Sequence, residues 1–222
     1  MFKSENKGKE PIKTNSDMTD FNENNTGNTL FPVFLKLHQL HTLIVGGGNV
    51  GLEKLEAVLR SSPEARVTLV AEEIRRPEIM EIARHHPNLE VIVRPFAMED
   101  LDEKDVSILA TDNRALHEKI KTETSKKHLL TNVADTPDLC DFYLCSIVKK
   151  GDLKIGVSTN GKSPTLAKRM REYLTETLPD TDQMQTLLDN LKAVRDKLGG
   201  DFEYKVQKLN EITASWLEDR EA

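Results

Sequence analysis

Short apolar runs alternate with amphipathic segments between residues 41 and 135. The apolar runs are rich in leucine and β-branched residues and are typical of buried strands. They cover residues 41–47, 65–73, 89–96, 105–112 and 128–135. The segments between three pairs of these runs, 49–62, 76–86 and 113–127, space their apolar residues as a helix does. This alternation predicts an α/β fold with a Rossmann-type, doubly wound parallel sheet.

The pattern changes in the second half of the chain. Residues 146–159 alternate apolar and polar positions around a Lys-Gly-Asp turn, which predicts an antiparallel β-hairpin. A helix with Pro164 near its start follows, and then come two amphipathic segments, 182–198 and 201–217. A hairpin and helices too small to hold a core alone favour packing against a second copy of the chain, in a homodimer.

The first residues have a different composition, rich in Asn, Lys, Ser, Thr and Glu, with almost no apolar side chains to repay the entropy of ordering. We therefore divide the chain into four parts. They are a flexible tail (1–28), a Rossmann domain that binds NAD (29–141), a dimerisation segment (142–178) and a C-terminal helical region (179–222).

Charge and composition exclude several classes of protein. The net charge of −6 argues against nucleic-acid binding, which needs a concentrated basic surface. No run of 18 apolar residues and no signal-peptide core are present, so we expect a cytoplasmic protein without a membrane partner. Cys140 and Cys145 lack further ligands at zinc spacing and are expected to be ordinary reduced thiols, while the six histidines are scattered.

A glycine-rich loop joins the first predicted strand to the first predicted helix. Gly46, Gly48 and Gly51 fit the pattern G-x-G-x-x-G. In that pattern the first glycine allows a tight turn, the second admits a pyrophosphate, and the third lets the helix pack on the strand. The N-terminus of the helix would face the anion with unpaired N–H groups. The alternative is a glycine turn that serves close packing alone.

An acidic residue at the end of the second strand supports the dinucleotide hypothesis. Glu72 lies about 20 residues after the glycine loop, where a carboxylate can accept hydrogen bonds from the ribose hydroxyls of NAD. Its neighbour Glu73 could do the same. Basic residues follow only at Arg75 and Arg76, so NAD is favoured over NADP.

Polar residues also follow the fourth and fifth strands, at the edge where parallel sheets bind ligands. The fourth strand ends in "ATDN" (110–113), and the segment after the fifth contains Asn132, Asp135 and Asp138. By position, Asp135 is the best candidate for a group that moves protons beside a nicotinamide. The alternative is that Asp135 caps a loop or a helix.

Several segments together resemble one protein family. They are "FPVFLKL", "LIVGGGNVGLEKL", "ATDN", "TNVADTPDLCDF" and "IGVSTNGKSPTLAKRMRE", in this order over residues 29–178. They are similar to the N-terminal module of sirohaem synthases, that is, to precorrin-2 dehydrogenases, many of which are also sirohydrochlorin ferrochelatases. The resemblance implies NAD-dependent conversion of precorrin-2 to sirohydrochlorin and, in many members, insertion of Fe(II) as a substrate. It also implies an intertwined homodimer.

The resemblance assigns roles to individual positions. The catalytic aspartate of the family falls on Asp135, and a serine that is modified in some members falls on Thr159. The positions implied to contact NAD or to lie near it are Asn49, Val50, Glu72, Glu73, Thr111 and Asp112. The chain departs from the pattern in having Gly51 where alanine is usual, and in lacking a proline before the hairpin.

The tetrapyrrole substrate carries eight carboxylates, so an acidic protein must offer it a local basic surface. The candidates are Lys162, Lys168, Arg169 and Arg171, although a solvated helix face would have the same composition. No set of metal ligands is predicted. Two other classes share some features: a redox-sensing NAD module without turnover, which has no use for Asp135, and a methyltransferase, whose glycine loop usually differs from this one.

Overall fold

The computed structural model describes residues 27–218, and the chain divides into two units, residues 1–32 and 33–222. In the first unit the described residues, 27–32, form no helix or strand. The predicted flexible tail lies almost entirely outside the described residues. The predicted domain boundaries therefore stay a prediction.

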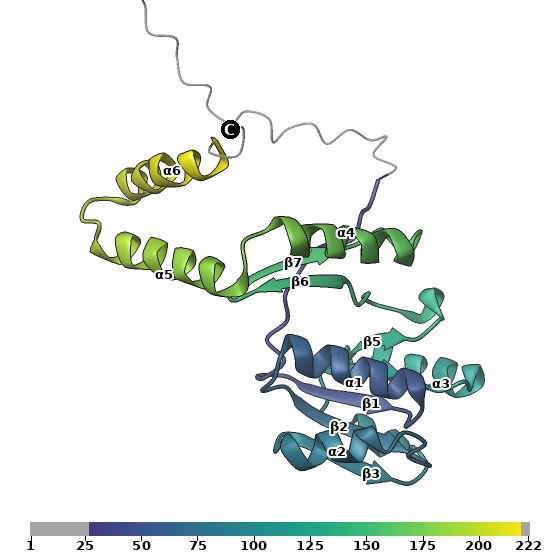
Figure 1. Ribbon diagram of the computed structural model, residues 1–222. Coiled ribbons are helices and arrows are strands. Elements are labelled where there is room, and N and C mark those ends of the chain that lie inside the picture. Colours follow the sequence, from purple (N-terminus) through teal and green to yellow (C-terminus); the bar gives the residue numbers. More distant parts are fainter. Residues whose placement is uncertain (1–26, 219–222) are drawn as a thin grey trace, which may run out of the picture. The chain divides into compact units, whose positions relative to one another are not determined.

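The second unit begins with a Rossmann domain built on a five-stranded parallel sheet (Figure 1). Its strands are β1 (His41–Val45), β2 (Arg66–Ala71), β3 (Leu89–Val93), β4 (Val106–Leu109) and β5 (Leu130–Val133). Its helices are α1 (Asn49–Ser61), α2 (Glu78–His85) and α3 (Arg114–Lys126). The strand order is β3-β2-β1-β4-β5, so the winding reverses between β1 and β4. The predicted fold class is confirmed.

The strands are buried on both faces because their side chains alternate between two apolar cores. On one face Ile44 of β1 packs with Leu55 of α1 and Ile79 of α2. On the other face Leu43 of β1 packs with Ile120 of α3. Continuous apolar runs were therefore the correct signal for these strands, and the helices cover both faces of the sheet.

The third and fifth strands end two or three residues before the apolar runs do, and a short 3-10 helix follows each of them. These are η1 (Met98–Leu101) after β3 and η2 (Pro137–Leu139) after β5. Arg94 binds Asp100 of η1 at 2.5 Å, and the Asp100 carboxylate also accepts the backbone N–H of Ala97 at 2.9 Å. These bonds lower the pKa of Asp100, so the turn is held by polar contacts that hydrophobic periodicity does not reveal.

The predicted hairpin and the helices after it are also present. The hairpin consists of β6 (Ser146–Lys150) and β7 (Leu153–Val157), and the helices are α4 (Pro164–Thr177), α5 (Thr181–Lys197) and α6 (Phe202–Glu218). Gly151 turns the hairpin with φ of 60°, and the side-chain amide of Gln185 on α5 bonds both the backbone and the carboxylate of Asp152. The Lys154 ammonium donates to the Ser61 carbonyl at the end of α1, at 2.6 Å.

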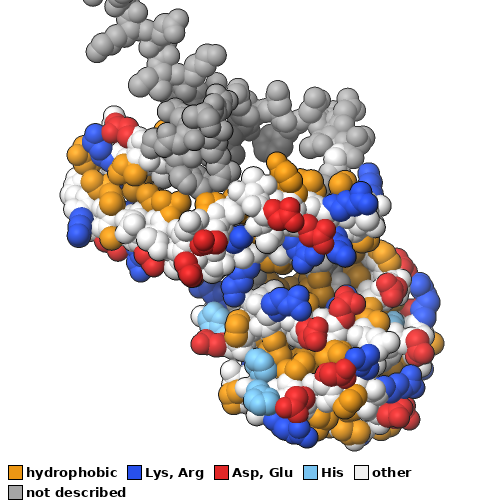
Figure 2. All heavy atoms as spheres, in the orientation of Figure 1, with side chains coloured by type: hydrophobic (Ala, Val, Ile, Leu, Met, Phe, Trp, Pro, Cys, Tyr) orange, Lys and Arg blue, Asp and Glu red, His pale blue; other side chains and the backbone are white. Residues whose placement is uncertain are grey.

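No helix among residues 27–218 combines the length and the apolar character that crossing a bilayer requires. On the face shown in Figure 2, acidic and basic side chains are interspersed over the Rossmann domain, and hydrophobic side chains gather over α5 and α6.

Candidate functional site

A cleft of about 950 Å³ lies at the carboxyl ends of the parallel strands, where the strand order reverses. Its walls come from the loops after all five strands of the Rossmann sheet. The lining includes eight of the nine predicted cofactor residues and the predicted catalytic residue: Gly46, Gly48, Asn49, Val50, Glu72, Glu73, Thr111, Asp112 and Asp135. The remaining glycine, Gly51, does not line the cleft.

The glycine loop is shaped by close backbone approaches at three positions. Gly46 has φ of 128°, and a Cβ there would stand 2.4 Å from the carbonyl oxygen of Ala110. A Cβ on Gly47 would stand 2.4 Å from the Glu73 carbonyl, and one on Gly51 would stand 2.1 Å from the Gly46 carbonyl. Gly51 thus lets the first turn of α1 lie close against the backbone of the loop, and the alanine usual in the resembled family would not fit this turn without a shift of the backbone.

Gly48 differs from the other glycines of the loop. A Cβ at this position would meet no atom within 4 Å, so its hydrogen faces open space in the cleft wall. Gly48 is also the N-cap of α1, and its carbonyl accepts the first bond of the helix, from the N–H of Leu52. No side chain caps this end and no acidic residue lies in the first turn. The free N–H groups of the turn can therefore bind an anion.

The two candidate ribose carboxylates differ in their partners. Glu73 binds the Nε of Arg75 at 3.1 Å, and both side chains are largely exposed. Glu72 makes no hydrogen bond or ion pair with any other described residue, so its carboxylate is free to accept hydrogen bonds from two hydroxyl groups. This difference favours Glu72 as the ribose ligand, which sequence alone could not decide.

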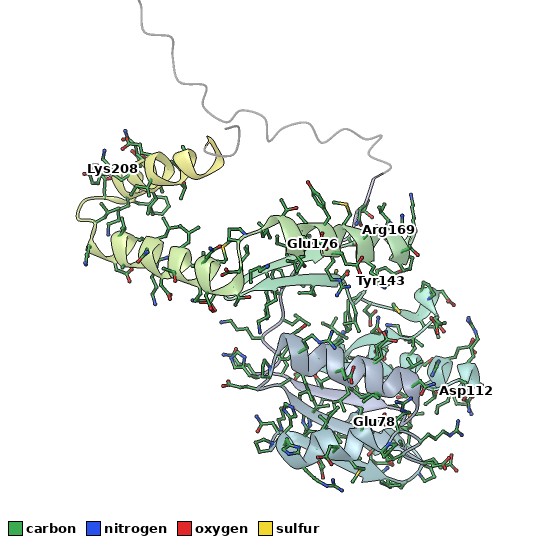
Figure 3. All side chains as sticks on the ribbon, viewed as in Figure 1. Glu78, Asp112, Tyr143, Arg169, Glu176 and Lys208 are labelled. Atoms are coloured by element: carbon green, nitrogen blue, oxygen red, sulfur yellow. The ribbon has the colours of Figure 1, made fainter. Side chains whose placement is uncertain are left out.

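A second arginine connects the first turn of α1 to α2. Arg76 donates from Nη1 to the Asn49 side-chain oxygen at 3.0 Å and pairs with Glu78 at 2.5 Å. Glu78 lies at the start of α2 (Figure 3). The bond to Arg76 lowers the pKa of Glu78, which keeps the pair ionised. The amide of Asn49 is thereby held in one orientation at the cleft.

The loop after β4 places Thr111 and Asp112 at the opposite wall, and Asp112 is labelled in Figure 3. The Thr111 hydroxyl lies 2.8 Å from Nε2 of His117 on α3. His117 is buried, and burial is the main cause of its lowered pKa. Sequence reasoning expected only scattered or satisfied histidines, so it did not place this ring at the cleft.

Asp135 is the second residue of a turn that follows β5. It has φ of 54°, a left-handed conformation that aspartate tolerates better than most residues, and the N–H of Thr136 closes the turn on the Val133 carbonyl at 3.3 Å. The Asp135 side chain is exposed at the cleft and bonds no other described residue. It is therefore available to a ligand instead of capping a loop.

The other polar residues after β5 hold the loop in place. Asp138 pairs with Arg114 at 2.7 Å, which lowers the pKa of the Asp138 carboxyl. Asn132 is buried and donates to the Phe142 carbonyl at 2.9 Å. Cys140 is a half-buried thiol that accepts the Val133 N–H, and burial raises its pKa. These residues support the turn that presents Asp135.

None of the predicted substrate-binding residues lines the cleft. They lie on the loop after β7 and on α4: Thr159, Lys162, Lys168, Arg169 and Arg171. The Thr159 hydroxyl accepts the N–H of Ser163, whose own side chain caps α4. Arg169 extends from α4 in Figure 3. Within one chain the structure thus brings together the predicted cofactor and catalytic residues, but not the predicted substrate residues.

Several cleft residues were missed by the sequence reasoning. They are Gly47, Pro95, Phe96, Arg114 and His117. Gly47 lies between two fingerprint glycines and was a visible signal, since the loop needs a glycine there to approach Glu73. The others reach the cleft through the loop after β3 or along α3, and only the three-dimensional arrangement shows this. No group of three or more potential metal ligands occurs among residues 27–218.

The cleft fits a dinucleotide by two independent features of its residues, and a third feature suits a molecule bound beside it. The open side of Gly48 and the uncapped N-terminus of α1 suit a pyrophosphate. The unpaired carboxylate of Glu72 suits a ribose diol. The exposed carboxylate of Asp135 on the opposite side can accept a proton from a molecule that lies against the cofactor.

Comparisons with known proteins agree with this geometry. Residues 33–146, about half of the chain, match the family described as "Putative NAD(P)-binding". Residues 150–177 match the family described as "Sirohaem biosynthesis protein central".

Similar proteins include siroheme synthase 1 of Serratia proteamaculans, 31% identical over 83% of this chain and 37% of that protein. Siroheme synthase of Psychrobacter arcticus is 31% identical over 84% of this chain and 32% of that protein. The chain thus spans about a third of the length of these relatives. Among solved structures, SirC, a precorrin-2 dehydrogenase, is 26% identical with a TM-score of 0.67, covering 82% of this chain and 89% of that one.

Proposed function

The chain belongs to the family described as "Putative NAD(P)-binding", and from this premise we propose that it is an NAD-dependent precorrin-2 dehydrogenase of sirohaem biosynthesis. The reaction removes two hydrogens from precorrin-2 and yields sirohydrochlorin. The observation that carries the proposal is the convergence of the glycine loop, the unpaired Glu72 and the exposed Asp135 on one cleft.

Different residues of the cleft would hold different parts of the cofactor. The N–H groups after Gly48 would bind the pyrophosphate, and the carboxylate of Glu72 would bind a ribose diol. Thr111 and Asp112 would border the cofactor on the side of β4. Bound NAD supplies a carbon that accepts a hydride, and the protein must supply the proton acceptor.

Asp135 is the proposed proton acceptor. Its carboxylate has no partner among the described residues, so it can approach an acidic C–H or N–H group of a tetrapyrrole in the cleft. The left-handed turn fixes the direction of its side chain, and the Arg114–Asp138 pair braces the same loop from α3. A positioned general base contributes roughly a hundredfold to ten-thousandfold in rate.

The basic residues of the loop after β7 and of α4 would bind the substrate carboxylates from a second copy of the chain. This homodimer is proposed because those residues lie away from the cleft of their own chain, and because α4 exposes three apolar side chains on one face. Leu166, Met170 and Tyr173 are spaced by helical turns and are 51%, 39% and 60% exposed.

Met170→Glu should give a monomer in sedimentation at a concentration where the parent is a dimer. A variant that stays dimeric would move the interface elsewhere.

Insertion of Fe(II) into sirohydrochlorin is a second proposed reaction at the same cleft. Two pyrrole N–H protons must leave as the metal enters, and Asp135 is the available carboxylate. We also propose that the protein works in the cytoplasm, where it would bind precorrin-2 from solution.

The decisive experiment is incubation of the purified protein with precorrin-2 and NAD. We expect sirohydrochlorin and NADH to appear in equal amounts, and metal insertion when Fe(II) or Co(II) is then added. Binding of NAD without any turnover of precorrin-2 would instead support the redox-sensing alternative. Binding of S-adenosylmethionine in place of NAD would support a methyltransferase.

A further inference from the structure

His117 occupies a position that the proposed reaction does not yet use. It lies on α3, is only 3% exposed, and still borders the cleft beside Thr111. Its Nε2 atom stands 2.8 Å from the Thr111 hydroxyl oxygen, which is a hydrogen-bond distance. A buried imidazole next to a hydroxyl at a ligand cleft controls which way that hydroxyl can bond.

The hydroxyl of Thr111 has one proton to donate and two lone pairs that accept. The backbone N–H of Asn113 points at the same oxygen from 3.5 Å, and a backbone N–H can only donate. One lone pair is therefore directed toward a donor. The state of the other lone pair, and of the hydroxyl proton, depends on whether Nε2 of His117 carries a hydrogen.

Two arrangements follow for a neutral ring. If Nε2 carries the hydrogen, His117 donates to Thr111, and the hydroxyl proton is free to point into the cleft. If Nε2 carries no hydrogen, the Thr111 hydroxyl donates its proton to Nε2 and can only accept a hydrogen bond from a ligand. Burial and the nearby Arg114 lower the pKa of His117, while Asp112 raises it, and burial is the largest effect.

The neighbours of Thr111 decide between these arrangements. Its methyl group packs against the glycine loop, where a Cβ on Gly46 would stand 3.3 Å from Cγ2 of Thr111. The pyrophosphate oxygens of a dinucleotide that rests on this loop are acceptors, and the uncapped end of α1 beside them is arranged for acceptors as well. A donating hydroxyl matches this site, and a second acceptor would not.

We propose that His117 is a positioning residue that donates from Nε2 to Thr111, so that the Thr111 hydroxyl donates its own proton to an oxygen of the bound dinucleotide. The inference rests on the proposed function, because it requires that a dinucleotide occupies the cleft. It assigns to α3 a role in cofactor binding that its buried ring performs without touching the cofactor.

The test is a double-mutant cycle on NADH binding, measured by the fluorescence of NADH with the full chain. Thr111→Val should weaken binding roughly tenfold or more, the size of a lost hydrogen bond to a charged group. His117→Phe should also weaken binding, but by no more than Thr111→Val, because the hydroxyl is kept and only its orientation is lost. The double variant should be no weaker than Thr111→Val. Two conservative variants are the matched controls: His117→Gln keeps an N–H donor and Thr111→Ser keeps the hydroxyl, and both should stay within about threefold of the parent.

Losses from Thr111→Val and His117→Phe that multiply in the double variant would overturn the proposal, as would wild-type affinity in either. If His117→Phe does not fold, the parent protein gives the answer, because ¹⁵N NMR of its histidines shows which ring nitrogen is protonated. A proton on Nδ1 alone of His117 refutes the proposed arrangement. Failure of the parent to bind NADH would instead refute the proposed function.

Discussion

Two glycines of the loop are expected to respond in opposite ways to the same added methyl group. At Gly48 the methyl would meet no atom within 4 Å, and φ of −93° is open to alanine. At Gly51 it would stand 2.1 Å from the carbonyl oxygen of Gly46, which is backbone and cannot swing aside. Gly48→Ala should therefore affect the ligand, and Gly51→Ala should affect the fold.

The magnitudes follow from the surroundings of each site. Gly48→Ala exchanges a glycine N-cap for a poorer one, a loss of up to about 1 kcal/mol, against an entropic gain of about 0.4–1 kcal/mol from stiffening the unfolded chain. Its stability should be nearly unchanged. Gly51→Ala gains the same entropy but overpacks the turn at about 1–3 kcal/mol or more. A net loss of about 1–2 kcal/mol would lower Tm by roughly 2–8 °C in a domain of this size.

The assays are thermal unfolding without ligand and titration with NADH. We expect Gly48→Ala to keep the parent Tm and to bind NADH at least tenfold more weakly, a change of about 1.4 kcal/mol. Gly51→Ala should lose Tm, with a smaller effect on NADH affinity once folded. Unchanged NADH affinity in Gly48→Ala would refute the assignment of this glycine to the pyrophosphate, since the added methyl group would then not touch the bound ligand.

Three further outcomes are expected. Glu72→Ala should weaken NAD binding by about 1–3 kcal/mol, and Glu73→Ala should weaken it less because Glu73 is paired with Arg75. Calorimetry measures both affinities, and a larger loss in Glu73→Ala would identify Glu73 as the ribose ligand in place of Glu72. Burial is the main cause of the lowered pKa of His41, so the imidazole is protonated more readily in the unfolded chain and the free energy of unfolding should fall as the pH drops below about 6.5. Denaturant titrations should show a smaller fall in His41→Gln than in the parent. An equal fall in both proteins would show that His41 does not cause the pH dependence. Thr42 buries a hydroxyl that has no hydrogen-bond partner within residues 27–218, so Thr42→Val should be neutral or stabilising by up to about 1–3 kcal/mol. A marked loss of Tm in Thr42→Val would show that the hydroxyl is bonded.

The sequence predicted those parts of the molecule that depend on local pattern. The five parallel strands follow from apolar runs, because both faces of the sheet are covered and each strand is apolar throughout. The cleft follows from topology, since the carboxyl ends of parallel strands meet at one edge. Eight of the nine predicted cofactor residues line it for this reason.

What the sequence could not give depends on contacts between distant residues or on backbone conformation. The choice between Glu72 and Glu73 rests on an ion pair with Arg75 that adjacency alone does not determine. The left-handed conformation of Asp135 arises from the turn that closes β5. His117 reaches the cleft from the first turn of α3, where its ring contacts Thr111 of the loop after β4, so its burial is a tertiary property.

Asp135 is the residue proposed to accept protons from a tetrapyrrole bound against NAD. The most direct measurement compares sirohydrochlorin formation by the parent and by Asp135→Asn. Asparagine tolerates the left-handed turn and keeps the size of the side chain, so only the carboxylate charge is lost. We expect turnover to fall roughly a hundredfold to ten-thousandfold while the affinity for NADH stays within about twofold of the parent. Turnover at the parent rate in Asp135→Asn would show that Asp135 is not the proton acceptor.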